Sequence, residues 1–120
     1  MKQYKLAEGE MKFAEIIWGN EPIKSGELVD LCEERFNWKK STTYTVLKKL
    51  CLRGVLENNN SIVTSIISKE EYLKYKSEEF VEDTFGGSLP KFLAAFMGNK
   101  RLSKKQADEL KELIDKYEED

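Results

Sequence analysis

Residues 41–56 read STTYTVLKKLCLRGVL, and this stretch decides the fold. Placed on a helix, it separates into an apolar face and a polar face. The inward face consists of Thr43, Val46, Leu47, Leu50, Cys51 and Gly54, and the outward face of Ser41, Thr45, Lys48, Lys49 and Leu52. Thr42 and Tyr44 lie at the margins. We therefore predict an amphipathic helix that begins at Ser41 and stops at Gly54.

Two further helices are predicted before this one, and a hairpin after it. The first covers residues 8–18, and the second is capped by Ser25, with Leu28, Cys32 and Phe36 recurring every four residues. The β-branched stretch 61–67 follows three asparagines, which predicts a hairpin with an Asn turn at residues 58–60. Three helices and then a hairpin is the order of a winged helix-turn-helix, whose third helix enters the major groove.

The second half of the chain is predicted to be helical. The capping-box sequence at residues 68–71 opens a helix that runs to about Phe85, and Gly86-Gly87 ends it. A short segment covers residues 89–97, and a second capping box at residues 103–106 opens a terminal helix. The expected fold class is mostly α with a small β-hairpin wing. Residues 1–68 would form the DNA-binding domain and residues 69–120 a helical dimerisation region.

The terminal helix carries an apolar stripe that must pack against something. An intrachain core is one alternative, but helices trailing a small domain more often bury such stripes in a partner, which favours a symmetric dimer. The residues predicted to form its interface are Leu89, Leu93, Phe96, Leu110, Leu113, Ile114 and Tyr117.

Charge is distributed unevenly, although the net charge is only −2. The interval between Glu34 and Glu57 holds two arginines and four lysines but no acidic residue. A solvated helix face is the plain explanation for such a run, but those faces usually interleave both signs. We therefore favour a polyanionic partner, namely double-stranded DNA.

The outward face of residues 41–52 suits groove insertion. Hydroxyl side chains stand where base edges would be reached, and lysines where phosphates would be met. The predicted DNA-binding residues are Lys39, Lys40, Ser41, Thr42, Tyr44, Thr45, Lys48 and Lys49. Thr43 is left out because it falls on the inward side. Tyr44 has two readings, as a ring at the core edge or as a contact to the DNA backbone.

Other functions find little support in the composition. The chain has no histidine, which removes the commonest general base and the imidazole metal ligands, so we expect no enzyme, no metal and no cofactor. Cys32 and Cys51 fall on inward stripes and are expected to be free packing residues. The longest apolar runs are too short to cross a membrane, and no secretory signal is evident, so we expect a cytoplasmic protein.

Several stretches together resemble the BlaI/MecI group of bacterial penicillinase repressors, which also includes copper-responsive members. The resemblance rests on residues 6–10 with 16–18, 26–29, 41–56, 67–72 and 103–116. It implies a homodimer joined through its carboxy-terminal helices, each amino-terminal domain binding half of an inverted-repeat operator to block transcription. The recognition-helix contacts would fall on Ser41, Thr42, Tyr44, Thr45 and Lys49.

Three departures from the group limit the resemblance. Ala95-Phe96 stands where β-lactam-responsive members have a cleavable Asn-Phe bond, which argues against induction by that cleavage. The inducing partner implied is therefore an unknown signalling protease or another inducer-linked protein. No cysteine follows Cys51, which excludes the copper-type metal site. The wing, residues 58–65, lacks a basic residue.

The leading hypothesis is a dimeric, sequence-specific repressor that occludes a promoter. The alternative is a winged-helix module that binds a protein and has lost DNA binding. The overall acidity and the uncharged wing motivate that alternative, and the basic run argues against it.

Overall fold

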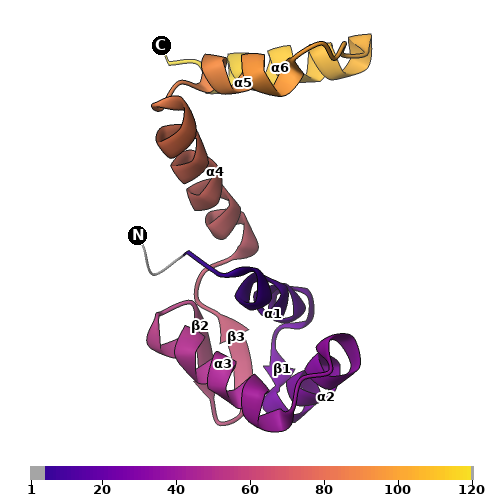
Figure 1. Cartoon of the computed structure of the whole chain (residues 1–120), viewed down its shortest axis with the longest axis vertical. Helices are drawn as coiled ribbons and strands as arrows, with labels where there is room; N and C mark the ends of the chain where they lie inside the picture. Colours follow the sequence, from indigo (N-terminus) through magenta and orange to yellow (C-terminus); the bar gives the residue numbers. More distant parts are fainter. Residues whose placement is uncertain (1–4, 120) are drawn as a thin grey trace. The chain divides into compact units, whose positions relative to one another are not determined.

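A computed structural model describes residues 5–119 and divides the chain into two compact units, one up to Glu79 and one from Phe80 onward (Figure 1). The elements of the first unit are α1 (Glu8–Asn20), β1 (Ile23–Lys24), α2 (Ser25–Phe36), α3 (Lys40–Leu52), β2 (Leu56–Asn59) and β3 (Ile62–Ser65). The helix α4 (Lys69–Phe85) begins in the first unit and ends in the second, which also contains α5 (Leu89–Met97) and α6 (Lys104–Tyr117). The predicted fold class, mostly α with a small antiparallel β element, is confirmed.

The β element is a three-stranded sheet in the order β1-β3-β2, antiparallel throughout. The strand β1 was not predicted, because two residues are too short to show a period in the sequence. Ile23 pairs with Val63, and the amide of Ser25 donates a 2.8 Å hydrogen bond to the carbonyl of Ser61. The wing is thereby fastened to the start of α2.

The predicted Asn turn was misplaced. Asn59 pairs with Ile62, so the turn consists of Asn60 and Ser61, and Asn58 belongs to β2. Both turn residues have positive φ, 51° and 68°, as in the two-residue turns whose twist matches that of paired strands. Asparagine tolerates this conformation better than most residues, which is why it occupies the first position.

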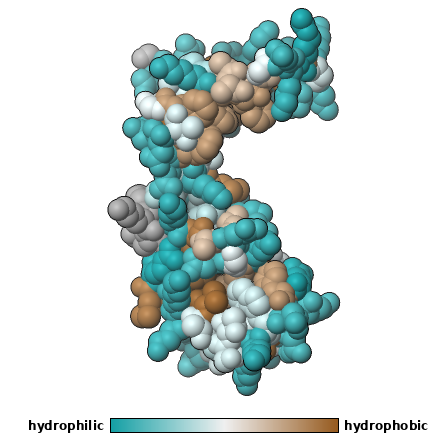
Figure 2. All heavy atoms as spheres, in the orientation of Figure 1, coloured by the Kyte–Doolittle hydropathy of each residue, from teal (hydrophilic) through white to brown (hydrophobic). Residues whose placement is uncertain are grey.

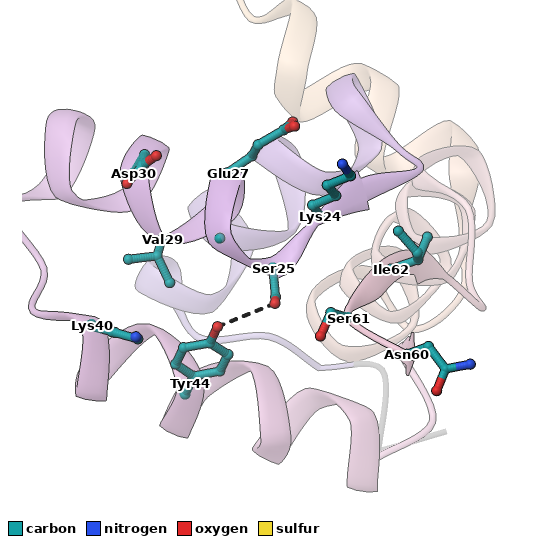
Figure 3. Close-up of a pocket in the computed structure, with 11 residues that line it drawn as sticks. Lys24, Ser25, Glu27, Val29, Asp30, Lys40, Tyr44, Asn60, Ser61 and Ile62 are labelled. Atoms are coloured by element: carbon teal, nitrogen blue, oxygen red, sulfur yellow. Dashed lines mark hydrogen bonds between the residues drawn. The ribbon is translucent and has the colours of Figure 1, made fainter.

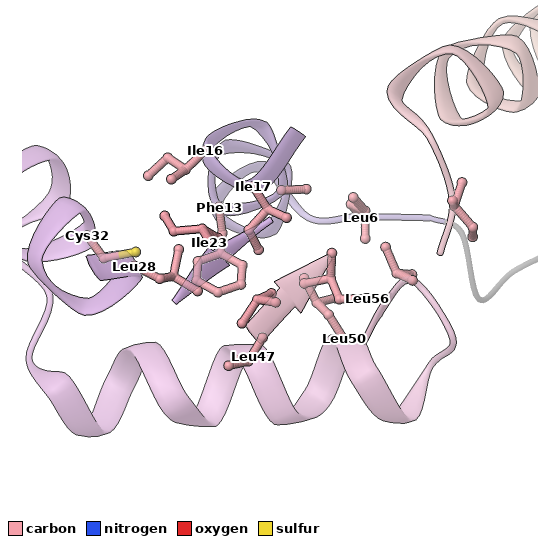
Figure 4. Close-up of a cluster of buried hydrophobic side chains, with 14 of the residues drawn as sticks. Leu6, Phe13, Ile16, Ile17, Ile23, Leu28, Cys32, Leu47, Leu50 and Leu56 are labelled. Atoms are coloured by element: carbon pink, nitrogen blue, oxygen red, sulfur yellow. The ribbon is translucent and has the colours of Figure 1, made fainter. Parts of the chain in front are cut away.

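The core of the first unit lies between α1, α2, α3 and the sheet (Figure 4). Phe13, Ile17, Leu28 and Leu50 are fully buried, as the helical periodicities predicted. Trp38 stacks on Phe13 with ring centroids 5.8 Å apart and closes one edge of this core. Burial of such large apolar side chains is the main force that fixes α3 against the sheet.

The start of α4 is attached to this core. Tyr72 is buried, and its ring lies 5.7 Å from that of Trp18, whose indole N–H donates to the carbonyl of Ile67. The predicted capping box is confirmed: the amide of Glu71 donates to the Ser68 hydroxyl, and the Ser68 amide donates to the Glu71 carboxylate. These bonds satisfy amide groups at the start of α4 that have no partner within the helix.

The second unit is built around aromatic rings and capped helices. Phe80, Phe85, Phe92 and Phe96 form a chain of ring contacts with centroids 5.6–6.0 Å apart. Ser88 caps α5 and Ser103 caps α6, each hydroxyl accepting a backbone amide hydrogen. The predicted bounds of α5 are confirmed. No helix within residues 5–119 is long and apolar enough to span a bilayer.

Candidate nucleic-acid interface

The outward face of α3 is exposed along its whole length. Ser41, Thr45, Lys48 and Leu52 recur at three- and four-residue steps, and all are exposed. Thr43 is fully buried, as predicted, and its hydroxyl donates to the carbonyl of Lys39. The helix begins at Lys40, one residue before the predicted start. The first turn therefore presents Lys40, Ser41 and Thr42 together to solvent.

Tyr44 joins the two helices of the helix-turn-helix. Its hydroxyl donates to the Ser25 hydroxyl at 3.2 Å, and the Lys40 ammonium lies 6.0 Å from the centre of its ring. Ser25 is buried and is the first residue of α2, not the predicted cap, because Lys24 precedes the helix as its N-cap. The ring of Tyr44 remains 36% exposed. Tyr44 thus lies at the core edge and still reaches the surface.

Neighbouring side chains of α2, α3 and the wing surround an open cleft of about 720 Å³ (Figure 3). Lys24, Lys40, Tyr44 and the turn residues Asn60 and Ser61 line it, together with two carboxylates from α2, Glu27 and Asp30. Sequence reasoning did not find this cleft, because its walls come from three elements that are remote in the chain. Its charge is mixed, because two lysines and two carboxylates are among the residues that line it.

Lys48 and Lys49, near the end of α3, have different neighbours. Lys49 turns toward α1, where its ammonium lies 3.1 Å from the carboxylate of Glu10. Lys48 lines a smaller cleft of about 340 Å³ with Tyr44, Leu47, Cys51 and Asn58 of β2. Two adjacent lysines in the sequence therefore have different neighbours, β2 for Lys48 and α1 for Lys49.

Glu10 is a second feature that the sequence did not reveal. Its side chain is only 12% exposed, and its carboxylate accepts from the Ala7 amide at 2.9 Å and from the Arg53 guanidinium at 3.2 Å. Burial raises the pKa of the Glu10 carboxyl, but the Ala7 amide, Lys49 and Arg53 together outweigh it and hold the pKa below its usual value. The basic run thus lacks acidic residues only along the chain, because in space the Glu10 carboxylate lies beside two of its cations.

The thiols and acidic groups give no sign of other chemistry. Cys32 is buried and Cys51 half-buried, both are free, and burial raises the pKa of each thiol above its usual value. Such thiols are poor nucleophiles at neutral pH. Among the described residues, no group of three or more Cys, Asp and Glu side chains is placed to hold a metal ion.

The second unit exposes a large part of its apolar surface. No described side chain of α5 or α6 is buried, and Leu89, Phe96, Leu113, Ile114 and Tyr117 are between 52% and 70% exposed. Leu93 and Leu110 are half-buried, and both line a groove of about 340 Å³ between α5 and α6. Figure 2 shows apolar side chains gathered on this unit. Among the described residues of α5 and α6, the apolar stripe is therefore not covered by other side chains to the point of burial.

Comparison with known proteins gives a consistent result. A family model described as "Penicillinase repressor" matches residues 6–116. The chain is 22% identical over 117 residues to a protein named penicillinase repressor from Bacillus licheniformis, covering 94% of this chain and 91% of the relative. It is 23% identical over 117 residues to a penicillinase repressor from Staphylococcus aureus, covering 94% of this chain and 93% of the relative.

Proposed function

The chain belongs to the penicillinase repressor family of transcriptional repressors, and from that membership we propose that it is a homodimer that binds an inverted-repeat operator and occludes a promoter. Residues 1–68 would contact DNA, and residues 69–120 would join the two copies. The observation that carries the proposal is the exposed outward face of α3, with hydroxyls in its first turns and Lys48 further along.

Base contacts are assigned to the first half of α3. Ser41, Thr42 and Thr45 are exposed and short enough to let the helix approach base edges closely, and a threonine methyl can contact the thymine methyl. Tyr44 reaches the same surface, with its hydroxyl held by Ser25. Sequence preference would therefore come from these four side chains.

Phosphate contacts are assigned to Lys39, Lys40 and Lys48, all exposed at the edges of the same face. Their ammonium groups would release condensed cations from DNA on binding, which makes affinity steeply dependent on salt. The wing offers Asn58, Asn60 and Ser61 as uncharged donors, so it would add hydrogen bonds without adding to the salt dependence.

Dimerisation is assigned to the exposed apolar residues of α5 and α6. Two copies of a surface that includes Leu89, Phe96, Leu113, Ile114 and Tyr117 would remove from water the side chains that one copy leaves exposed. The two copies of α3, related by a two-fold axis, would then match an inverted repeat, because the symmetry of the operator mirrors that of the protein.

The test is selection of duplexes from a random pool by the purified full-length protein, followed by binding measurements across a range of salt concentrations. We expect enrichment of a two-fold symmetric sequence and affinity that falls steeply as salt rises. Failure to retain any duplex at low salt would support the alternative, a protein-binding module. The carboxylates of Glu27 and Asp30, which line the cleft beside α3, would then explain the failure by repelling the phosphates of DNA.

A matched pair of variants localises the interface. Lys48→Ala should weaken binding to all duplexes and lower the salt slope by about one for each bound subunit. Lys74→Ala, which removes an exposed lysine from α4, serves as the control and should leave the slope unchanged. An equal loss in both variants would contradict the placement of the interface on α3.

A further inference from the structure

The Glu10 carboxylate contacts three polar groups. One oxygen lies 3.1 Å from the Lys49 ammonium, and the other accepts from the Arg53 guanidinium at 3.2 Å and from the Ala7 amide at 2.9 Å. The Glu10 side chain is 12% exposed and that of Arg53 25%, so water screens this contact less than it screens an ordinary surface pair, whereas the Lys49 side chain is 63% exposed. The contacts hold Glu10 ionised.

The same junction joins three parts of the first unit. Glu10 lies in the first turn of α1, Lys49 in the last turn of α3, and Arg53 directly follows α3. The Arg53 guanidinium also donates to the backbone carbonyl of Lys5, in the segment before α1. The end of α3 is therefore connected to α1 through charged groups.

This geometry has a direct electrostatic consequence. The basic run places two cations, Lys49 and Arg53, at the end of α3, and both share one carboxylate on α1. A phosphate that approached Lys49 would have to compete with Glu10 and would be repelled by it. Lys48 lies beside Asn58 of β2, and the described residues that line its cleft include no carboxylate.

We propose that Glu10 is a positioning residue for DNA binding, which holds Lys49 and Arg53 on α1 and leaves Lys48 as the phosphate contact at this end of α3. The inference rests on the proposed function, and it replaces the DNA contact that the sequence analysis and the family resemblance assigned to Lys49. By withholding two cations, Glu10 would lower non-specific affinity while the base-reading side chains stay unchanged. The ratio of specific to non-specific binding would rise accordingly.

The experiment measures binding of full-length protein to a random-sequence duplex by fluorescence anisotropy, from low to moderate salt. Four proteins are compared: Lys48→Met, Lys49→Met, Glu10→Gln and the double variant Glu10→Gln/Lys49→Met. Methionine and glutamine are close in size to the side chains that they replace and remove their charge. Measurements are made well below the unfolding temperature of each variant.

We expect Lys48→Met to lower the salt slope by about one per bound subunit, which is about threefold in affinity between 50 and 200 mM salt. Lys49→Met should leave the slope within error of the wild type. Glu10→Gln should steepen the slope by at least about one, because a released lysine gains a phosphate. Adding Lys49→Met to Glu10→Gln should reverse much of that increase. A merely structural role for Glu10 would weaken binding without steepening the slope.

Two results would overturn the inference. One is a slope lowered by Lys49→Met as much as by Lys48→Met, with Glu10→Gln unchanged. The other is a lack of coupling between Glu10 and Lys49, measured on the protein without DNA. We expect a double-mutant cycle on unfolding to give this pair a coupling of at least about twofold in the unfolding equilibrium constant. No coupling would remove the basis of the inference even if DNA binds. If the coupling is present but no duplex binds, the proposed function fails and the phosphate role of Lys48 fails with it.

Discussion

Thr45 stands at the centre of the outward face of α3, and its hydroxyl is already oriented. Its O–H donates to the carbonyl of Ser41 at 2.9 Å, so the exposed oxygen is left to act as an acceptor toward DNA. An oxygen presented in this way can accept from the N–H groups of adenine or cytosine, and the methyl can contact thymine.

Two substitutions at Thr45 separate these contributions. Thr45→Val keeps a methyl and removes the hydroxyl, and we expect it to lose about 1–3 kcal/mol of operator binding and to relax base preference at one position per half-site. Thr45→Ser keeps the hydroxyl and should retain most of the preference. Duplex selection with both variants measures the outcome. Unchanged affinity and preference in the valine variant would exclude a hydroxyl contact.

At the scale of elements, the wing turn stores conformational strain. Ser61 has a φ of 68°, a region in which serine is less stable than glycine. Its side chain is exposed, and its backbone carbonyl, which accepts from Ser25, is kept by any substitution.

Ser61→Gly should therefore raise the free energy of unfolding by about 0.5–1 kcal/mol in urea titrations, with little change in the slope on denaturant. Asn60→Gly is the matched control. It should gain less, because asparagine already tolerates a positive φ. A larger gain at Asn60 than at Ser61 would contradict this assignment of strain within the turn.

The junction between α1 and α3 makes stability depend on pH. Because the pKa of Glu10 is lower in the folded chain than in the unfolded one, its contribution is complete above the unfolded pKa and is lost as pH falls through the folded pKa. Glu10→Gln should therefore be less stable than wild type by about 1 kcal/mol near neutral pH, and the difference should shrink toward zero in acid. Thermal unfolding monitored by circular dichroism across this range tests the expectation. A difference that stays constant with pH would exclude ionised Glu10 as the source.

The elements differ in how far their sequences predict them. The bounds of α5 and the capping box of α4 can be predicted from the local sequence, because cap residues and helical periods involve neighbours in the chain. The strand β1 does not, since only pairing with β3 makes Ile23 and Lys24 extended. Ser25 was predicted to cap α2 because serine favours that position, but it is the first residue of the helix, is buried and accepts a hydrogen bond from Tyr44.

For the whole molecule, association should depend on the second unit. Leu113→Glu places a charge on the exposed apolar stripe, and burial of that charge in a dimer would be strongly unfavourable. We expect a monomer mass by light scattering, and weaker operator binding because each half-site is then bound independently. Lys111→Glu, also on α6, is the control for added negative charge and should retain the dimer. A full dimer mass for Leu113→Glu would contradict the assigned interface.

The predicted interface on α3 also depends partly on neighbours in the chain and partly on residues that are remote in the sequence. The exposure of Ser41, Thr45 and Lys48 could be predicted because the period of a helix fixes which residues share a face. The different neighbours of Lys48 and Lys49 could not, because Glu10 is far away in the sequence. The mixed charge of the cleft in Figure 3 depends likewise on how α2, α3 and the wing meet.

Both tryptophans of the chain lie in the first unit, where Trp18 contacts Tyr72 and Trp38 stacks on Phe13. Indole emission excited at the red edge of the absorption band therefore reports on this unit alone, since tyrosine and phenylalanine do not absorb there. If the proposed dimer separates while the first unit stays folded, the native emission spectrum should be kept. Loss of emission and loss of molecular mass, followed together during dilution or heating, would show which of the two units fails first.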